Sequence, residues 1–140
     1  MHIKSICAAA TLALFVAGAA HAETLHFMAT LKGADETPPT SSAGTGMVMA
    51  TYDTGSKKFQ YDVTYSGLTG PAMAAHFHSG AVGAKGPPVV PVTGSVASPI
   101  SGSATLTDAQ AAGLEAGNWY FNIHTAANPG GEVRGQVLKQ

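Results

Sequence analysis

The segment that decides the fold class of this chain is residues 59–65, with the sequence FQYDVTY. Its apolar residues alternate with polar ones. Because successive side chains of a β-strand point to opposite faces of a sheet, this period of two predicts a strand with one buried face. The same alternation recurs at 25–31, 119–124 and 132–137, so the chain is predicted to be rich in β-structure.

Weaker β-patterns fill the intervals between these segments. Pro- and Gly-rich turn signals separate them. About eight short strands at this spacing are typical of an all-β sandwich or barrel. The weaker strands are expected at 45–52, 73–78, 89–93 and 100–106.

One short helix is expected near residues 107–114. Thr107 and Gln110 stand three residues apart, as in a capping box, in which a threonine hydroxyl and a glutamine side chain each bind the other's backbone amide. Its predicted role is structural.

The composition excludes several classes of protein. The chain has 140 residues, of which 45% are hydrophobic and 11% charged, and its formal net charge is −1. This hydrophobic fraction is too high for a disordered chain. The near-neutral charge argues against nucleic-acid binding, which requires clustered Lys and Arg. The length fits a single domain.

Residues 1–22 have the pattern of a secretory signal peptide. Lys4 precedes an apolar run at 6–20, and Ala20-His21-Ala22 forms a cleavage motif. The run is shorter than the roughly 20 residues that span a bilayer, so no membrane span is expected. We therefore expect an exported protein, periplasmic or secreted, whose mature domain covers 23–140. Cys7 lies in the signal, so thiolate chemistry is excluded from the mature domain.

The strongest chemical pattern is His76-Phe77-His78 together with His124. Residues two apart in a strand share a face, so His76 and His78 form a pair, and His124 points away from the core of its own strand. If the two strands are neighbours, three imidazoles converge on one ion. This arrangement suits copper, or alternatively zinc, with one open position. His26 and Met28 are candidates for a further ligand.

Other readings of these residues stay open. Histidines on a strand face are often only solvated. Asp62 and Glu132 are candidates to orient an imidazole, although a solvated surface acid is the more common case. Glu132 and Arg134 stand two apart on one strand face and are expected to form an exposed ion pair across to a neighbour, unless Arg134 steers an anion toward the histidines. No nucleophile motif and no carboxylate pair predicts a catalytic residue.

Six ordered motifs resemble the CHRD domain, named after chordin, over essentially the whole mature chain. The resemblance implies an immunoglobulin-like Greek-key β-sandwich. CHRD domains occur beside growth-factor-binding modules in chordins and as small exported bacterial proteins, and this chain looks like the latter. The motifs are LKGADETPP (31–39), AHFHSGA (75–81), GPPVV (86–90), LTDAQ (106–110), GNWYFNIHT (117–125) and NPGGEVRGQ (128–136).

A second likeness is to copper-zinc superoxide dismutase, also a β-sandwich, in which a His-x-His pair, a late histidine and an arginine lie at the copper. His76, His78, His124 and Arg134 would correspond. This chain lacks the disulfide and the bridging His and Asp set of that enzyme, so only a copper-only site stays open.

Three functions are therefore considered. The first is an exported copper-binding module using His76, His78 and His124. The second is a non-catalytic adhesion or protein-interaction module, which the likeness to chordin implies. The third is a copper-only enzyme similar to superoxide dismutase.

Overall fold

The computed structural model describes residues 18–140. Most of the predicted signal peptide, residues 1–17, lies outside the described residues, and residues 18–23 have no regular secondary structure. Among the residues described, no helix is long and apolar enough to cross a membrane.

Every expected strand is present, with ends that differ by a residue or two from the predicted ones. The strands are β1 (Thr24–Lys32), β2 (Thr45–Asp53), β3 (Lys58–Ser66), β4 (Ala72–Ser79), β5 (Pro88–Pro91), β6 (Ile100–Thr105), β7 (Trp119–Thr125) and β8 (Val133–Lys139). A short 3-10 helix, η1 (Gly33–Asp35), follows β1, and one α-helix, α1 (Asp108–Glu115), lies between β6 and β7.

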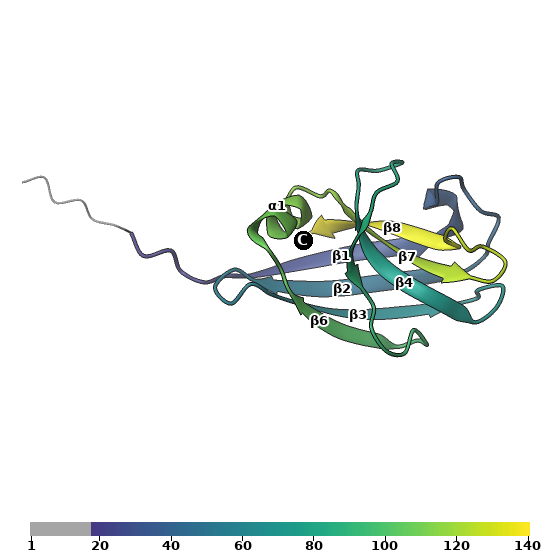
Figure 1. Cartoon of the computed structure of the whole chain (residues 1–140), viewed down its shortest axis with the longest axis horizontal. Helices are drawn as coiled ribbons and strands as arrows, with labels where there is room; N and C mark the ends of the chain where they lie inside the picture. Colours follow the sequence, from purple (N-terminus) through teal and green to yellow (C-terminus); the bar gives the residue numbers. More distant parts are fainter. Residues whose placement is uncertain (1–17) are drawn as a thin grey trace, which may run out of the picture.

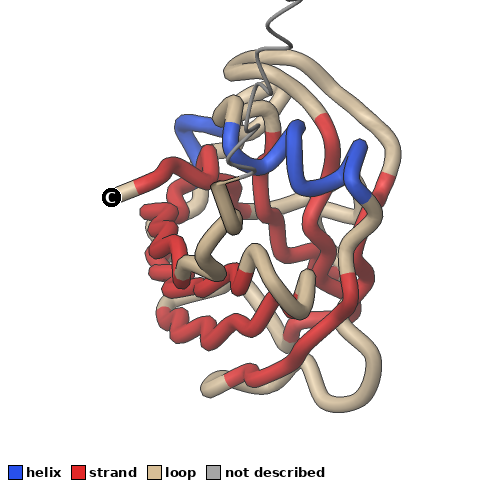
Figure 2. Tube along the Cα trace, turned by 90° about the vertical axis from the view of Figure 1, so that its left-hand side faces the viewer, coloured by secondary structure: helices blue, strands red, loops and turns tan. Residues whose placement is uncertain are grey.

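The strands form one antiparallel sheet in the order β5-β4-β7-β8-β1-β2-β3-β6. β3 and β4 lie near opposite ends of this order, yet the rings of Phe59 on β3 and Phe77 on β4 pack with centroids 5.1 Å apart. The sheet must therefore roll over on itself, and Figure 2 shows the rolled outline with the helical segments along one side. The expected all-β, sandwich-like fold is confirmed.

An aromatic cluster fills the space between the two halves of the rolled sheet. Phe59 also packs against Trp119 of β7, with ring centroids 5.5 Å apart. Phe59, Phe77 and Trp119 are all buried because the period of two turns each of them inward. The core thus fixes β4 and β7 next to each other, and the outward residues of these two strands build the site (Figure 1).

Helix α1 confirms the predicted capping box. The backbone amide of Gln110 donates to the Thr107 hydroxyl at 3.2 Å, and the amide of Thr107 donates to the Gln110 side chain at 2.9 Å. Ala111 and Leu114 face the core. The short helix that the sequence predicts is therefore present, one residue further along the chain than expected.

Candidate metal centre

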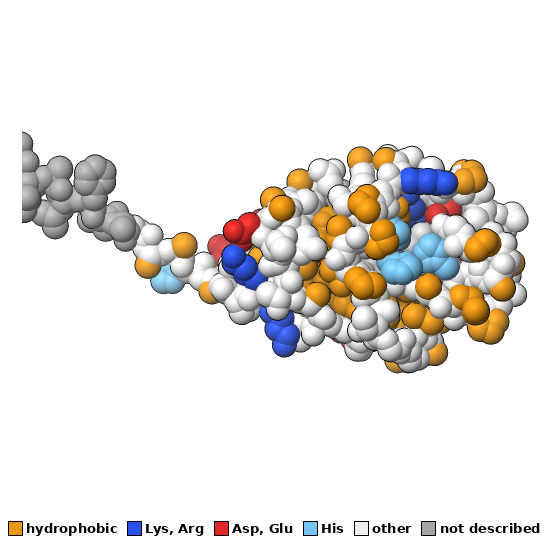
Figure 3. All heavy atoms as spheres, in the orientation of Figure 1, with side chains coloured by type: hydrophobic (Ala, Val, Ile, Leu, Met, Phe, Trp, Pro, Cys, Tyr) orange, Lys and Arg blue, Asp and Glu red, His pale blue; other side chains and the backbone are white. Residues whose placement is uncertain are grey.

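The structure brings His76, His78 and His124 together. β4 pairs with β7 so that His76 lies opposite Asn122, which places His124 diagonally across from His76 on the same face. Each imidazole offers one nitrogen, and these nitrogens all lie within 4.8 Å of one another. Figure 3 shows histidine side chains gathered in one patch on this face. The prediction that the three imidazoles converge is confirmed.

Backbone carbonyls orient two of the three rings. Nδ1 of His78 lies 2.9 Å from the carbonyl oxygen of Gly86, and Nδ1 of His124 lies 2.8 Å from that of Pro129. A carbonyl only accepts hydrogen bonds, so each Nδ1 carries the proton and each Nε2 keeps a lone pair. This pairing of an imidazole N–H with a fixed acceptor is typical of histidines that bind metal ions.

The free nitrogens face one another. Nε2 of His124 lies 3.3 Å from Nδ1 of His76. Nε2 of His78 is buried and has no hydrogen-bond partner among the described residues. A buried polar atom without a partner is rare in proteins and marks a place for an ion or a water. The donor set therefore fits a metal ion.

The surroundings of His76 and His78 favour their neutral forms. Burial lowers the pKa of both His76 and His78, and charge on the neighbouring histidines lowers it further. A neutral imidazole is the form that binds a metal. His76 and His78 are therefore suited to act as metal ligands rather than as proton donors.

The carbonyl that holds His78 belongs to a glycine that no other residue can replace without a backbone shift. A Cβ on Gly86 would lie 1.5 Å from the carbonyl oxygen of Ser79. The loop that carries Gly86 is held against the end of β4, since the amide of Ser79 donates to the carbonyl of Pro87 at 3.0 Å. The absence of a side chain at position 86 thus allows the close approach that orients His78.

Tyr120 supports His78 from the next strand. Its ring stacks on that of His78, with centroids 4.7 Å apart and planes within 2° of parallel. The amide of Gly86 donates to the Tyr120 hydroxyl at 3.2 Å. Arg134, from β8 on the other side of β7, places its guanidinium carbon 3.5 Å from the centre of the Tyr120 ring.

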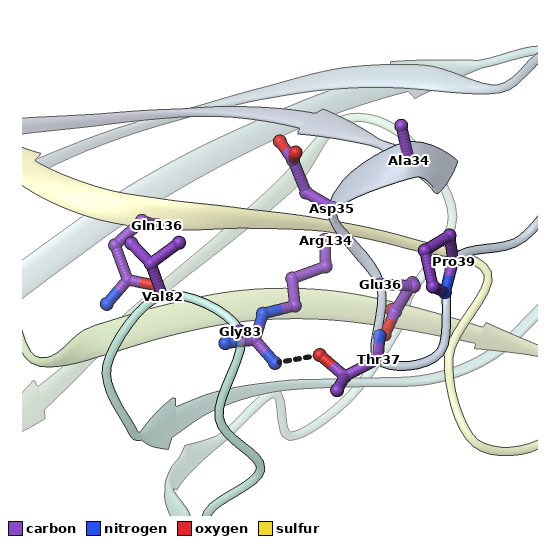
Figure 4. Close-up of a pocket in the computed structure, with 9 residues that line it drawn as sticks. All are labelled: Ala34, Asp35, Glu36, Thr37, Pro39, Val82, Gly83, Arg134 and Gln136. Carbon is purple, nitrogen blue, oxygen red and sulfur yellow. Dashed lines mark hydrogen bonds between the residues drawn. The ribbon is translucent and has the colours of Figure 1, made fainter.

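Arg134 is buried, which contradicts the expected exposed ion pair across to a neighbour. Its side chain donates to the Thr37 hydroxyl at 2.9 Å and to the carbonyl of Ala81 at 3.1 Å. Figure 4 shows this guanidinium turned toward Thr37 and Gly83. The prediction is wrong because two loops, residues 33–44 and 80–87, fold over the outer face of β7 and β8 and replace water there.

Glu132 is not the solvated acid that the sequence favoured. It is fully buried and accepts hydrogen bonds from Ser42, Thr69, Thr125 and Asn128. Burial alone raises the pKa of a carboxylic acid, but these hydrogen bonds outweigh it and lower the pKa of Glu132 to about 2. Glu132 joins three loops at one end of the sheet rather than orienting a histidine.

Glu36 is a residue near the site that the sequence reasoning missed. It is 6% exposed, and burial raises the pKa of its carboxyl. Its Oε1 and Nδ2 of Asn122 both lie against Gly131, and Asn122 pairs with His76 across the strands. The motif at 31–39 contains Glu36, but no spacing in the sequence relates it to the histidines.

His26 and Met28 do not join the cluster. β1 lies two strands away from β7 in the sheet, and Lys32 of β1 occupies the row of Arg134, Asn122 and His76. His26 is six residues from Lys32 along the strand, a separation of about 20 Å. Asp62, also proposed beside the histidines, lies on β3 and accepts the Ser101 hydroxyl at 2.5 Å.

Fold and site together define a class: an all-β domain with one rolled antiparallel sheet and three converging imidazoles on its outer face. The family model described as the CHRD domain matches residues 27–137, and the chain belongs to this family. Neither a curated protein nor a solved structure matches the chain.

Proposed function

We propose that this protein is an exported metal-binding module that holds one copper ion at His76, His78 and His124. The observation that carries the proposal is the convergence of three imidazole nitrogens within 4.8 Å, one of them buried without a partner. Export rests on the signal pattern of residues 1–22.

The donor set favours copper or zinc over harder ions. Imidazole nitrogens suit copper, zinc and nickel, whereas magnesium and calcium prefer oxygen ligands. Copper(II) stands highest in the affinity order of divalent first-row metals for a given site, so it is the first candidate and zinc the second. Three ligands leave one position of a tetrahedral ion open to water or to a small molecule.

One base and one acid lie near the cluster, Arg134 and Glu36. The positive charge of Arg134 helps to lower the pKa of His78, so by itself it opposes a cation. Glu36 is the acid nearest to these groups: burial raises the pKa of its carboxyl, while the charges on Arg134 and His124 favour its ionised form. A bound cation would favour ionisation of Glu36 further.

Titration of the purified protein with Cu(II) and with Zn(II), followed by calorimetry against a competing chelator, tests the proposal. We expect one ion per chain and a loss of affinity of at least about 100-fold in His124→Ala. His26→Ala is the matched control, because it removes an exposed histidine from β1 and should bind as the wild type does. Equal, weak binding by the wild type and by a triple His76, His78 and His124 to Ala variant would overturn the proposal.

The second candidate is a non-catalytic adhesion or protein-interaction module. Val82, which is 81% exposed in the loop at 80–87, is the kind of apolar side chain that such a surface uses. A partner captured equally well with and without a chelator, and lost in Val82→Ser, would favour this candidate.

A further inference from the structure

The methionines within the described residues 18–140 lie outside the hydrophobic core. The sequence has five, of which Met1 precedes the described residues. Met47, Met49 and Met73 are 42%, 59% and 66% exposed, and Met28 is half-buried. Methionine usually fills gaps in hydrophobic cores, and exposure leaves its sulfur open to oxidation. Their position outside the core therefore calls for a separate explanation.

Two of these methionines face each other. Met28 of β1 and Met49 of β2 are directly opposite in the antiparallel register, and both point to the outer face of the sheet. Directly opposite residues have Cβ atoms about 5 Å apart, which lets their side chains meet above the strands. His26 stands two residues before Met28 on the same face, and it is diagonal to Met49.

These three side chains line one shallow pocket. Asp62 of β3, opposite Met49, lines the same pocket and brings a negative charge, and no Lys or Arg is among its lining residues. The pocket thus combines two thioethers, an imidazole and a carboxylate in a place that does not repel a cation. Along β1, His26 lies about 20 Å and Met28 about 13 Å from the row that contains His76.

We propose that this pocket binds one soft monovalent ion, Cu(I), through the thioether sulfurs of Met28 and Met49 and the imidazole of His26. Thioethers are poor ligands for hard ions and select Cu(I). A hydrophobic surface that docks another protein would not need the histidine and the carboxylate that line this pocket, His26 and Asp62. The proposal does not depend on a metal at His76, His78 and His124.

The test uses Ag(I) as the probe, because silver has the ligand preference of Cu(I) without its redox chemistry. Excess Zn(II) is added first, to occupy His76, His78 and His124. Methionine methyl groups are then followed by NMR while Ag(I) is titrated. We expect the Met28 and Met49 methyl signals to shift with about one equivalent of Ag(I) and the Met73 signal to stay in place.

Leucine variants complete the test, since leucine matches methionine in volume and lacks the sulfur. Met28→Leu with Met49→Leu should bind Ag(I) at least about tenfold more weakly than the wild type, and His26→Gln should also weaken binding. Met73→Leu is the control and should bind as the wild type does. An unchanged melting temperature in the double variant would show that it is folded.

Two results would overturn the proposal. The first is methyl signals of Met28 and Met49 that do not move with Ag(I). The second is a double leucine variant that keeps the wild-type affinity for Ag(I). A double variant that changed only its self-association in sedimentation would also overturn it, because the face would then be an apolar contact surface. A failure of Zn(II) to bind at the three histidines would weaken the proposed function while leaving these readouts intact.

Discussion

The outer face of β7 and β8 and the outer face of β1 to β3 belong to one sheet and follow one alternating pattern, but they differ in burial. On β3, Gln60, Asp62 and Thr64 are exposed, as the alternation predicts. On β7, Tyr120 and Asn122 occupy the equivalent outward positions and are only 3% exposed. The alternation in a strand therefore predicts which face packs in the core, whereas the loops determine whether the other face is exposed to solvent.

The largest expected effect is a difference in stability between two variants, one that loses an acid on the covered face and one that loses an acid on the open face. Glu132→Ala on the covered side removes a fully buried carboxylate that accepts several hydrogen bonds, so the free energy of unfolding at pH 7 should fall by about 3 kcal/mol or more. Asp62→Ala on the open side removes an acceptor that serves one exposed hydroxyl and should cost less than about 1 kcal/mol. Urea unfolding of both variants measures the difference, and equal losses would contradict it.

The same carboxylate should give the protein a distinct response to acid. The pKa of Glu132 falls from an ordinary 4.5 to about 2 in the folded state. A group with a lowered folded-state pKa stabilises the protein fully above its unfolded pKa, and the contribution is lost as the pH falls through the folded one. Stability should therefore decline between pH 4.5 and 2.

The difference between the wild type and Glu132→Gln isolates this contribution, because other acids titrate alike in both proteins. Urea midpoints measured from pH 7 down to about 2 should converge as the pH falls. Two curves that stay parallel would show that Glu132 does not ionise in this way.

Much of this molecule could be predicted from its sequence. The period of two in segments such as 59–65 predicts the strands because burial of one face imposes it directly. The spacing of Thr107 and Gln110 predicts the start of the helix. The alternation of inward and outward side chains is enough to place His76, His78 and His124 on outward faces. The aromatic core then brings their strands together.

The rest depends on contacts that have no local period. Glu132 and Arg134 look like surface charges because each stands among polar neighbours at outward positions. Their partners, such as Ser42, Thr69 and Thr37, come from loops 60 or more residues away in sequence. Glu36 was missed for the same reason, since only the folded loop brings it near Asn122.

A third prediction concerns the loop over the histidines. Gly86→Ala forces a Cβ to within 1.5 Å of the Ser79 carbonyl oxygen, so the backbone that orients His78 must move. Metal affinity should fall by about 10- to 100-fold, the usual cost of losing the group that orients a ligand. Gly70→Ala is the control, since a Cβ there meets nothing within 4 Å. Calorimetric titration with Cu(II) compares the two, and equal affinities would rule out the orienting role of Gly86.

The smallest expected effect comes from removing a single hydroxyl on the covered face, that of Tyr120. Tyr120→Phe keeps the ring that stacks on His78 and loses two hydrogen bonds of the hydroxyl, one accepted from the Gly86 amide at 3.2 Å and a longer one donated to the Gly86 carbonyl at 3.4 Å. Stability should fall by about 1 kcal/mol, because the site is covered and the amide is left without a partner. The carbonyl of Gly86 still accepts from His78, so metal affinity should change less than in Gly86→Ala. Tyr120→Phe could instead weaken metal binding as strongly as Gly86→Ala does. The Tyr120 hydroxyl would then hold the loop over His78, and the absence of a side chain at position 86 would not.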